Sequence, residues 1–499
     1  MKRIIAISIL VCLSIPILAQ ESKENADFKL AVSLYNDKLY DLAVEQFRQF
    51  VAAYPNSAQG IEARFYLGLT QRQLKKHEEA RFTFQNFALS FPDHPKAAES
   101  WWNVGEAYAE MQNPQEAALA FERVKTFHSK SPLAPDALLK ASEYFGKAGD
   151  KESSKKTLRS LTQEYGSSPV VLEARLRLAR IYFSEQQFEL SRAEASKVSE
   201  GSKDPALAPA ALQIAASSLS RLGKLEEAKK ALNEIITKYR TSPSYFEAML
   251  ALADLNAGSG SFEEAKIVWK QIIASKDNPP TRVKEAAFLA QGDAEILQGR
   301  LKDALASFES AIGLRSVRSG EAAFKAARAA ERLGNVAKAG EWYLRAAEDS
   351  AESADRRALI AGAVHGAKLV KNYNLLTRYA QKYREQFPRD RYTPAILIET
   401  ASAFLDELND PRHAQDLYDL VFTDFPESEL ADDALFGSAR ALKAASQPGE
   451  ALRSLETLIK RFPSSDFLPA ARDLEFEIRT FDQKDKEGGV ENLALLTGA

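Results

Sequence analysis

The fold is decided by one stretch in the first quarter of the chain, WWNVGEAYAEMQNPQEAALAF, residues 101–121. Ala117 and Phe121 stand four residues apart, a spacing that places two side chains on one face of a helix. Asn113-Pro114 precedes them, and this pair favours a turn that opens a new helix. The stretch therefore predicts two helices joined by a tight turn. The small residue lets a neighbouring helix approach, and the aromatic residue fills the space between the helices.

The small residue at position 117 recurs along the whole chain. We call it the anchor, and we number the repeats that carry it from 1 to 12. The anchors are Ala43, Ala80, Ala117, Ser154, Ser191, Ala228, Ala265, Ala304, Ala339, Leu376, Ala414 and Ala451. The first seven follow one another at steps of 37 residues, and the later steps are 39, 35, 37, 38 and 37. A chain of 499 residues exceeds the size of one core, about 250–300 residues, so it must form several domains or one repeat array, and the regular steps favour the array.

Three further positions keep the same register. Four residues after the anchor, seven repeats carry an aromatic ring: Phe47, Phe84, Phe121, Trp269, Phe308, Tyr343 and Tyr418. Five residues before it, five repeats carry glycine: Gly149, Gly223, Gly260, Gly299 and Gly334. Twelve residues after it, five repeats carry proline: Pro55, Pro92, Pro388, Pro426 and Pro463. The glycine predicts a left-handed end to the first helix, and the proline ends the second. Where glycine is absent, the expected turns are Asn36-Asp37, Asn113-Pro114 and Asn409-Asp410-Pro411.

The pattern Trp-x2-hydrophobic-Gly-x2-Tyr…Ala-x3-Phe of residues 101–121 resembles the tetratricopeptide repeat (TPR). Tyr66-Leu67-Gly68 and Leu178 to Tyr182 carry parts of it. The resemblance covers roughly Asp27 to Phe481. It implies an all-α, right-handed superhelical solenoid of about twelve helix–turn–helix repeats, with the pattern aromatics packed between helices.

The period of 37 residues is longer than the usual ~34. The extra length falls in a joint of the form Phe/Tyr-Pro-x-Ser-x-x-Ala, as at Pro55-Asn-Ser-Ala. This joint resembles the repeats of bacterial envelope TPR proteins, such as the TPR lipoprotein of the β-barrel assembly machinery and the TPR partner of the Tol–Pal system. The chain lacks the lipidated cysteine of the first and the coiled coil of the second, and it has more repeats than either. The resemblance therefore implies a repeat class and a compartment.

The N-terminus has the order of a secretory signal peptide. Lys2 and Arg3 are followed by an apolar run from Ile4 to Leu18 and by the small Ala19. This order is typical of a segment removed on export, and the run is shorter than the ~20 residues that span a bilayer. We therefore expect cleavage near Ala19 and a periplasmic protein. A retained membrane anchor is the alternative.

Three segments follow from these patterns: a signal peptide over 1–19, the TPR solenoid over 20–481 and a flexible C-terminal tail over 482–499. The single cysteine, Cys12, lies in the first segment. Lipidation there is disfavoured by the bulky Val11, because lipoprotein signals carry a small residue at that place. Without Cys12 the exported chain has no thiol, so disulfides and cysteine chemistry are excluded. No second apolar run is long enough to span a membrane.

Repeats 4, 5 and 10 depart from the pattern. Ser154, Ser191 and Leu376 replace the anchor alanine. Ala195 and Ala380 replace the aromatic residue four positions later. We expect the solenoid to bend or loosen at these repeats, because a missing ring leaves less to fill the space between helices.

Little in the sequence points to catalysis or to a cofactor. The five histidines show no metal-ligand spacing, and phosphate-loop and nucleophile-elbow motifs are absent. Pairs such as Glu78-Glu79 recur in register at the start of the second helix, where they favour the helix dipole. The net charge is −3, or −5 without Lys2 and Arg3, which gives no basic footprint for nucleic acid. We therefore predict no enzyme activity, no metal and no cofactor.

Function is expected on the concave face of the stacked repeats, which such proteins use for binding. The positions beside the packing residues of the first helix predict a groove. Its candidate residues are Phe65, Leu69, Arg72, Trp102, Asn103, Arg177, Arg180 and Phe183. Burial of Phe65 and Trp102 between repeats is the alternative.

The leading hypothesis is a periplasmic scaffold that binds envelope proteins or peptides in this groove. An accessory role in outer-membrane protein assembly, secretion or cell-envelope and division coordination is a second possibility. A structural, self-associating envelope component is a third. The oligomeric state stays open.

Overall fold

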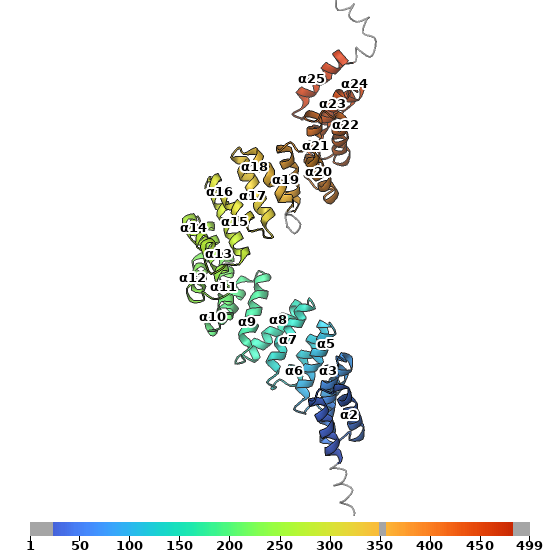
Figure 1. Cartoon of the computed structure of the whole chain (residues 1–499), viewed down its shortest axis with the longest axis vertical. Helices are drawn as coiled ribbons and strands as arrows, with labels where there is room; N and C mark the ends of the chain where they lie inside the picture. Colours follow the sequence, from blue (N-terminus) through green and yellow to red (C-terminus); the bar gives the residue numbers. More distant parts are fainter. Residues whose placement is uncertain (1–22, 349–355, 483–499) are drawn as a thin grey trace, which may run out of the picture. The chain divides into compact units, whose positions relative to one another are not determined.

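The computed structural model describes residues 23–348 and 356–482, and the side chains of residues 481 and 482 are left aside. The expected signal peptide lies outside the described residues, as does the expected tail beyond Asp482. Within the described ranges the chain is all helix, turn and bend, with no strand. The expected all-α fold of helix–turn–helix repeats is confirmed. Figure 1 shows the helices following one another in pairs.

The chain divides into two compact halves, Met1–Ala248 and Met249–Ala499. The N-terminal half begins with a helix over residues 23–36. Its further helices are α2 (Tyr40–Ala53), α3 (Ala58–Gln73), α4 (His77–Ser90), α5 (Ala97–Glu110), α6 (Pro114–Phe127), α7 (Ala134–Lys147), α8 (Lys151–Glu164), α9 (Val171–Ser184), α10 (Phe188–Gly201), α11 (Leu207–Arg221) and α12 (Leu225–Lys238). The division falls within α13 (Tyr245–Gly258).

The C-terminal half continues the same alternation. Its helices are α14 (Phe262–Ala274), α15 (Thr281–Leu297), α16 (Leu301–Gly313), α17 (Ser319–Arg332), α18 (Val336–Glu348), α19 (Arg356–Leu369), α20 (Tyr373–Gln386), α21 (Thr393–Asp406), α22 (Pro411–Asp424), α23 (Ala431–Ala444), α24 (Pro448–Arg461), α25 (Leu468–Glu477) and the π-helical turn η1 (Ile478–Asp482). In each repeat the odd-numbered helix comes first, and we call it helix A. The even-numbered helix that follows is helix B.

Every anchor lies in a helix B and is buried, the most exposed being Ser154 at 6%. In repeats 2, 3 and 8 the aromatic ring four residues later packs onto a glycine of helix A in the same repeat, Gly68, Gly105 or Gly292. A side-chain carbon added at Gly105 would lie 2.8 Å from the Phe121 ring, and one at Gly292 would lie 2.5 Å from the Phe308 ring. No side chain could be accommodated there without a shift, so the glycine and the aromatic residue of the pattern are needed together.

The turn between helices A and B is the same in all twelve repeats, whatever its sequence. The residue five positions before the anchor has a positive φ in each repeat, between 73° and 83° for the five predicted glycines. The other seven are Lys38, Lys75, Gln112, Gln186, Lys371, Asn409 and Ser446, with φ between 50° and 61°. Of the three turns expected where glycine is absent, Asn409 is itself the left-handed residue, whereas Asn36-Asp37 and Asn113-Pro114 lie beside it and Lys38 and Gln112 take the conformation.

The reason lies in the backbone hydrogen bonds of the turn. The N–H of Lys76 donates to the carbonyl oxygen of Gln71 at 2.9 Å, and that of Asp150 donates to Phe145 at 2.9 Å. This bond closes the C-terminal end of helix A only when the residue before the donor is left-handed. A lysine or a glutamine is therefore forced into a conformation that glycine adopts freely.

The Phe/Tyr-Pro joints end helix B as expected. The aromatic residue is the last to donate into the helix: the N–H of Phe91 bonds the carbonyl oxygen of Phe87, and that of Phe387 bonds Tyr383. Proline follows immediately, and it cannot continue the helix because it has no N–H.

Candidate binding site on the first helices of the repeats

The eight predicted groove residues lie on helices A of the N-terminal half, on α3, α5 and α9. Only Arg180 is exposed. Five are half-buried: Leu69, Arg72, Trp102, Arg177 and Phe183. Phe65 and Asn103 are buried, at 2% and 3% exposure, so for these two the expectation of a groove-facing side chain was wrong.

Packing explains the burial of Phe65. Its ring meets the rings of Phe84 and Phe87 at centroid distances of 5.5 and 5.8 Å, and the ammonium group of Lys96 covers it at 5.0 Å. Trp102 stands at the same register position in the next repeat, 5.3 Å from the Phe121 ring, yet it keeps part of its surface exposed. Both rings therefore pack in the core between helices, which is the alternative of burial between repeats given for Phe65 and Trp102.

The buried Asn103 is the meeting point of two helices A. Its amide nitrogen donates to the carbonyl oxygen of Glu99 at 2.8 Å, and its amide oxygen accepts a hydrogen bond from Arg72. Arg177 instead bonds Glu173 of its own helix at 2.6 Å. The structure thus joins only Arg72 and Asn103 of the predicted set by a hydrogen bond, as a link between repeats.

Ion pairs connect successive helices A in both halves. In the N-terminal half Lys140 lies 2.6 Å from Glu106, and Arg177 lies 3.7 Å from Glu143. In the C-terminal half Arg440 lies 2.8 Å from Asp406. These pairs are partly exposed, so each contributes little to stability. The ion pairs matter more for binding than for stability, because a side chain that is already in an ion pair is less available to a partner.

One stretch of the helix-A surface in the C-terminal half is hollowed and carries unpaired positive charge. A cavity of about 420 Å³ opens there. Its lining residues come from α17, α18, α19, α20 and the joint before α21: Phe324, Arg328, Tyr343, Arg357, Ala358, Ala361, Gly362, His365, Tyr383 and Tyr392. Aromatic and arginine side chains of this kind anchor protein interfaces.

His365 links three consecutive helices A beside this cavity. Its Nε2 lies 3.0 Å from a carboxylate oxygen of Glu331, and its Nδ1 lies 3.2 Å from one of Glu399. The hydrogen bonds to Glu399 and Glu331 outweigh burial and raise the pKa of His365 to about 9. The imidazole is therefore protonated at neutral pH, and the hydrogen bond from His365 lowers the pKa of Glu331.

A third carboxylate beside the cavity, Asp390, also takes its hydrogen-bond partners from within the chain. Although burial opposes it, hydrogen bonds from the Tyr392 N–H, the Tyr383 hydroxyl and Arg357 lower the pKa of Asp390. Arg357 lies 2.8 Å from that carboxylate. Arg328 and Arg391, by contrast, have no carboxylate at ion-pair distance among the described residues. Arg391 adjoins the cavity and donates a hydrogen bond to the Tyr392 hydroxyl, and the exposed Tyr392 ring has Arg357 at 5.8 Å and Arg391 at 4.6 Å.

The sequence held a signal for this cavity that our prediction did not use. Leu69 and Arg180 stand eleven residues before their anchors. Arg328 and His365 occupy the same register position in repeats 9 and 10. Carrying the register into the C-terminal half would have found both residues, although not Tyr392, which lies in the joint.

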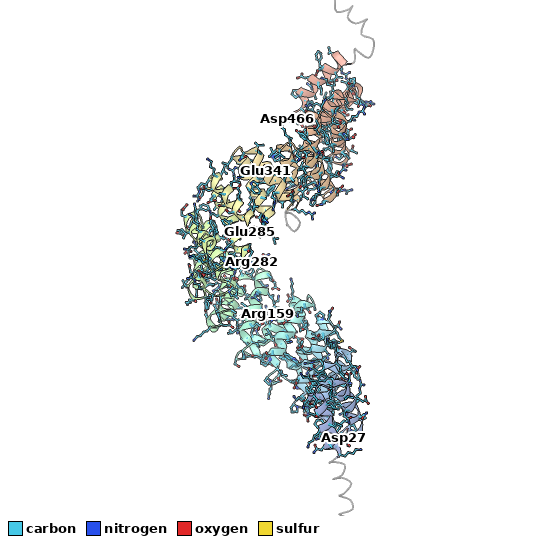
Figure 2. The ribbon with its side chains drawn as sticks, in the orientation of Figure 1. Asp27, Arg159, Arg282, Glu285, Glu341 and Asp466 are labelled. Atoms are coloured by element: carbon cyan, nitrogen blue, oxygen red, sulfur yellow. The ribbon has the colours of Figure 1, made fainter. Side chains whose placement is uncertain are left out.

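The described residues offer little for catalysis. No three His, Cys, Asp or Glu side chains among them converge on a possible metal position. Glu285, labelled in Figure 2, is a buried carboxylate on α15 that accepts a hydrogen bond from Ser316, and burial raises its pKa. The Glu78-Glu79 pair lies in the first turn of α4, where such charges stabilise a helix. Across the part of the chain that the structure describes, no helix combines the length and apolarity needed to cross a membrane.

Comparisons with known proteins agree with this geometry. Residues 92–242 match the family of the tetratricopeptide repeat-like domain, and residues 289–354 match a tetratricopeptide repeat family. A further tetratricopeptide repeat family matches residues 25–57, 62–94 and 433–465. A search of curated proteins found no match.

Two solved structures are similar at low identity. A chain of the APC/C hetero-tetramer Cut9-Hcn1 is 13% identical, with 93% of this chain and 98% of that chain covered and a TM-score of 0.28. The C-terminal part of a TPR repeat-containing protein from Cytophaga hutchinsonii is 14% identical, with 52% and 98% covered and a TM-score of 0.38. On the family matches and the repeat geometry together, the chain contains tetratricopeptide repeats in both halves.

Proposed function

We propose that the chain is an interaction scaffold that binds a protein segment carrying acidic residues, and that the cavity over α17 and α19 is where the segment docks. The observation that carries the proposal is that Arg328, which lines the cavity, and Arg391, which adjoins it at Tyr392, have no carboxylate at ion-pair distance among the described residues. Asp390 and Glu331 accept hydrogen bonds from their neighbours, and the contacts of Arg391 are with the ring and hydroxyl of Tyr392. Arginine pairs well with carboxylates because its planar group donates two parallel hydrogen bonds.

The aromatic surface of the cavity supports a peptide rather than a free ion. Tyr392 is 44% exposed, and Phe324 is partly buried at the cavity wall. Rings of this kind supply a large contact area with few rotatable bonds. A segment with one apolar residue among carboxylates would contact both the rings and the arginines.

The compartment is part of the same proposal. The order of charged, apolar and small residues over 1–19 supports export to the periplasm, where the partner would be another envelope protein. An accessory role in outer-membrane assembly, secretion or cell-envelope and division coordination is compatible with such a scaffold. Mass spectrometry of the protein purified from the producing cell tests the export step: a mature N-terminus at Gln20 supports it, and an intact Met1 contradicts it.

Site-specific photo-crosslinking in intact cells tests the docking site. A photoreactive phenylalanine analogue at Tyr392 should give one discrete adduct, and Arg328→Glu should abolish it. The matched control places the same analogue at Phe82, which is 60% exposed on helix B of repeat 2, away from the cavity. An adduct that survives Arg328→Glu would contradict the proposal, and an adduct made only of two copies of this chain would favour a self-associating component.

A further inference from the structure

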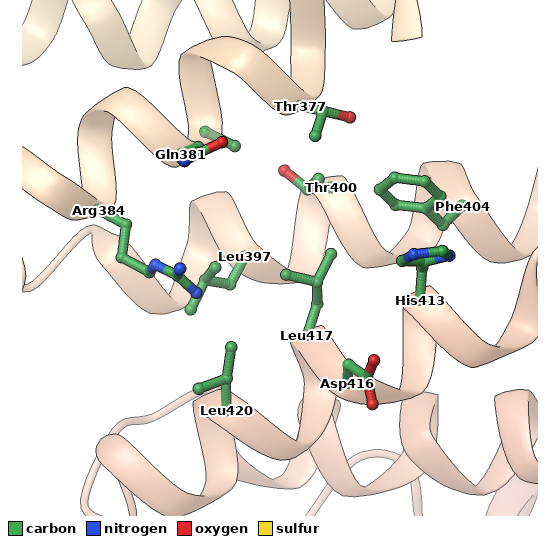
Figure 3. A pocket seen from close by; sticks show the side chains of 11 residues that line it. Thr377, Gln381, Arg384, Leu397, Thr400, Phe404, His413, Asp416, Leu417 and Leu420 are labelled. Atoms are coloured by element: carbon green, nitrogen blue, oxygen red, sulfur yellow. The ribbon is translucent and has the colours of Figure 1, made fainter. Parts of the chain in front are cut away.

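Repeat 10 departs from the repeat pattern, and the structure leaves a cavity beside it. Its anchor is Leu376, and Ala380 stands where other repeats carry the aromatic ring. A cavity of about 270 Å³ lies between α20, α21 and α22 (Figure 3). Its lining residues are Thr377, Ala380, Gln381, Arg384, Leu397, Thr400, Phe404, His413, Asp416, Leu417 and Leu420. We call this cavity the repeat-10 socket.

The neighbouring repeats show what the socket lacks. In repeat 9 the Tyr343 ring approaches Gly362 of the following helix A, where an added side-chain carbon would lie 3.0 Å from the ring. In repeat 11 the Tyr418 ring lies against Gly437 at the same register position. A side-chain carbon added at Gly437 would lie 2.4 Å from that ring. In repeat 10 this position is Thr400, which lines the socket opposite Ala380. The small Ala380 thus faces the medium-sized Thr400, and a space of about the volume of one aromatic ring is left unfilled between them.

The socket is apolar inside and charged at its ends. Figure 3 shows Arg384 at one side and Phe404, His413 and Asp416 at the other, with leucines between them. Arg384 and Asp416 are both exposed, and neither has an ion-pair partner among the described residues. The imidazole of His413 is held by Asp410 at 2.6 Å and stacks on the Phe404 ring at 5.5 Å.

The socket does not share a surface with the cavity over α17 and α19. Leu397, Thr400 and Phe404 stand at positions that share one face of α21. Glu399, which bonds His365 beside the other cavity, lies on a different face of the same helix. The socket therefore lies between the helices B of repeats 10 and 11, and each site can be altered without the other.

We propose that the repeat-10 socket binds an aromatic side chain of a partner peptide that carries an acidic residue toward Arg384 and a basic residue toward Asp416. An aromatic side chain fits because the open volume is the one that the repeat's own ring fills elsewhere. The stacked Phe404 and His413 add a face against which a further ring packs favourably. The opposite charges at the two ends fix the orientation of the peptide, since like charges facing each other would oppose binding.

The test uses the full chain and a fluorescently labelled, capped peptide Glu-Ala-Ala-Phe-Ala-Ala-Lys, with binding read by fluorescence anisotropy. Replacement of the central Phe by Ala in the peptide should weaken binding about tenfold or more, as the loss of an interface anchor does. Ala380→Phe restores the ring of the repeat inside the socket and should abolish binding to a similar extent. Circular dichroism checks that this variant keeps its helices.

A charge exchange keeps the test decisive if Ala380→Phe does not fold. Arg384→Glu alters an exposed side chain, so the fold is expected to persist. It should weaken the Glu…Lys peptide about twofold to fivefold and favour a Lys…Lys peptide by a similar factor. Arg453→Glu is the matched control, because its side chain is 75% exposed on α24 and lines neither cavity, and it should leave binding of both peptides unchanged.

Three results would overturn the proposal. The first is equal binding of the Phe and Ala peptides, and the second is equal binding by the parent chain and a folded Ala380→Phe. The third is tighter binding of a peptide of residues 490–499 of this chain than of the Phe peptide, since the occupant would then be the chain's own C-terminal segment.

Discussion

Repeats 5 and 10 lack the same aromatic ring, and the structure deals with the loss in opposite ways. In repeat 5, Ala195 is fully buried in a cluster with Ala179 and Ala215, and Ile214 of the next helix A packs against them. In repeat 10, Ala380 faces Thr400, and the repeat-10 socket remains between them. The register position of Ile214 and Thr400 is the same, fourteen residues before the next anchor.

The difference shows that the two positions across a repeat boundary are filled jointly. A ring faces a glycine in repeat 11, and an alanine faces an isoleucine in repeat 5. Either combination fills the space between the two facing positions, because packed cores tolerate exchange of volume between neighbours better than loss of it. An alanine and a threonine together supply less volume. Repeat 10 is therefore a boundary with room for a foreign side chain.

Introduction of a phenylalanine ring should give the largest difference in stability between repeats 5 and 10. Ala195→Phe should lower the free energy of unfolding by about 1–3 kcal/mol or more, because the filled core of repeat 5 has no room for the ring. Ala380→Phe should cost less than ~1 kcal/mol or stabilise the chain, because the ring enters an existing cavity. Urea unfolding followed by circular dichroism measures both. Equal losses in the two variants would break the comparison.

Exchange of the facing residues is the reciprocal experiment. Ile214→Thr should destabilise repeat 5 by about 1 kcal/mol, as removal of buried methyl groups does. Thr400→Ile should raise stability by up to ~1 kcal/mol, since it fills the socket and leaves only the local hydrogen bond from Thr400 to Ile396 unmade. The same unfolding assay applies. Destabilisation of similar size by both exchanges would show that repeat 10 is already closed in solution.

The left-handed turns of repeats 5 and 10 should show the same change in stability on substitution by glycine. They therefore serve as a control for the comparison of the two repeats. Lys371→Gly and Gln186→Gly should each stabilise the chain by about 0.5 kcal/mol. The left-handed strain of ~1–2 kcal/mol is relieved, and glycine's entropy cost of ~0.5–1 kcal/mol offsets part of the gain. Thermal unfolding of both variants beside Gly334→Ala, expected to be destabilising, gives the measurement. A loss of stability on Lys371→Gly would contradict the common turn.

The smallest effect is expected in the pH dependence of stability, from His365 on helix A of repeat 10. Repeat 5 carries no histidine at the same register position, so this effect is confined to repeat 10 in the comparison. The pKa of His365 is raised from 6.5 to about 9 in the folded chain. The stabilisation is therefore complete below pH 6.5 and is lost as the pH rises through about 9. The side chain is 38% exposed, so solvent screening limits the effect to about 1 kcal/mol or less. Unfolding between pH 6 and 10 should show this loss in the parent chain and a flatter profile in His365→Gln; identical profiles would argue against it.

The sequence predicts the parts of this fold that depend on local periodicity. The anchors and the rings four residues later are visible because one helix face carries both. The left-handed lysines and glutamines are not visible, because the turn's hydrogen bonds impose a conformation that these residues do not favour by themselves.

Surface position is harder to predict than register. Phe65 and Trp102 share one register position, and each has a lysine ammonium over its ring, Lys96 and Lys140, yet Phe65 is 2% exposed and Trp102 keeps part of its surface exposed. The cavity over α17 and α19 depends on Tyr392 from a joint, and the repeat-10 socket depends on two residues in different repeats. Both need the contacts between repeats, which no single segment of the sequence contains.

Docking of an acidic protein segment in the cavity over α17 and α19 can be measured directly in solution. Fluorescence anisotropy of a labelled, capped peptide Glu-Glu-Leu-Glu-Glu with the parent chain, Arg328→Glu and the matched surface variant Arg453→Glu measures this docking; the Arg453 side chain is 75% exposed on α24 and lines neither cavity. We expect binding to the parent chain and to Arg453→Glu that weakens with added salt, and a loss of about tenfold or more in Arg328→Glu. Equal affinity of the parent chain and Arg328→Glu would contradict the proposed docking.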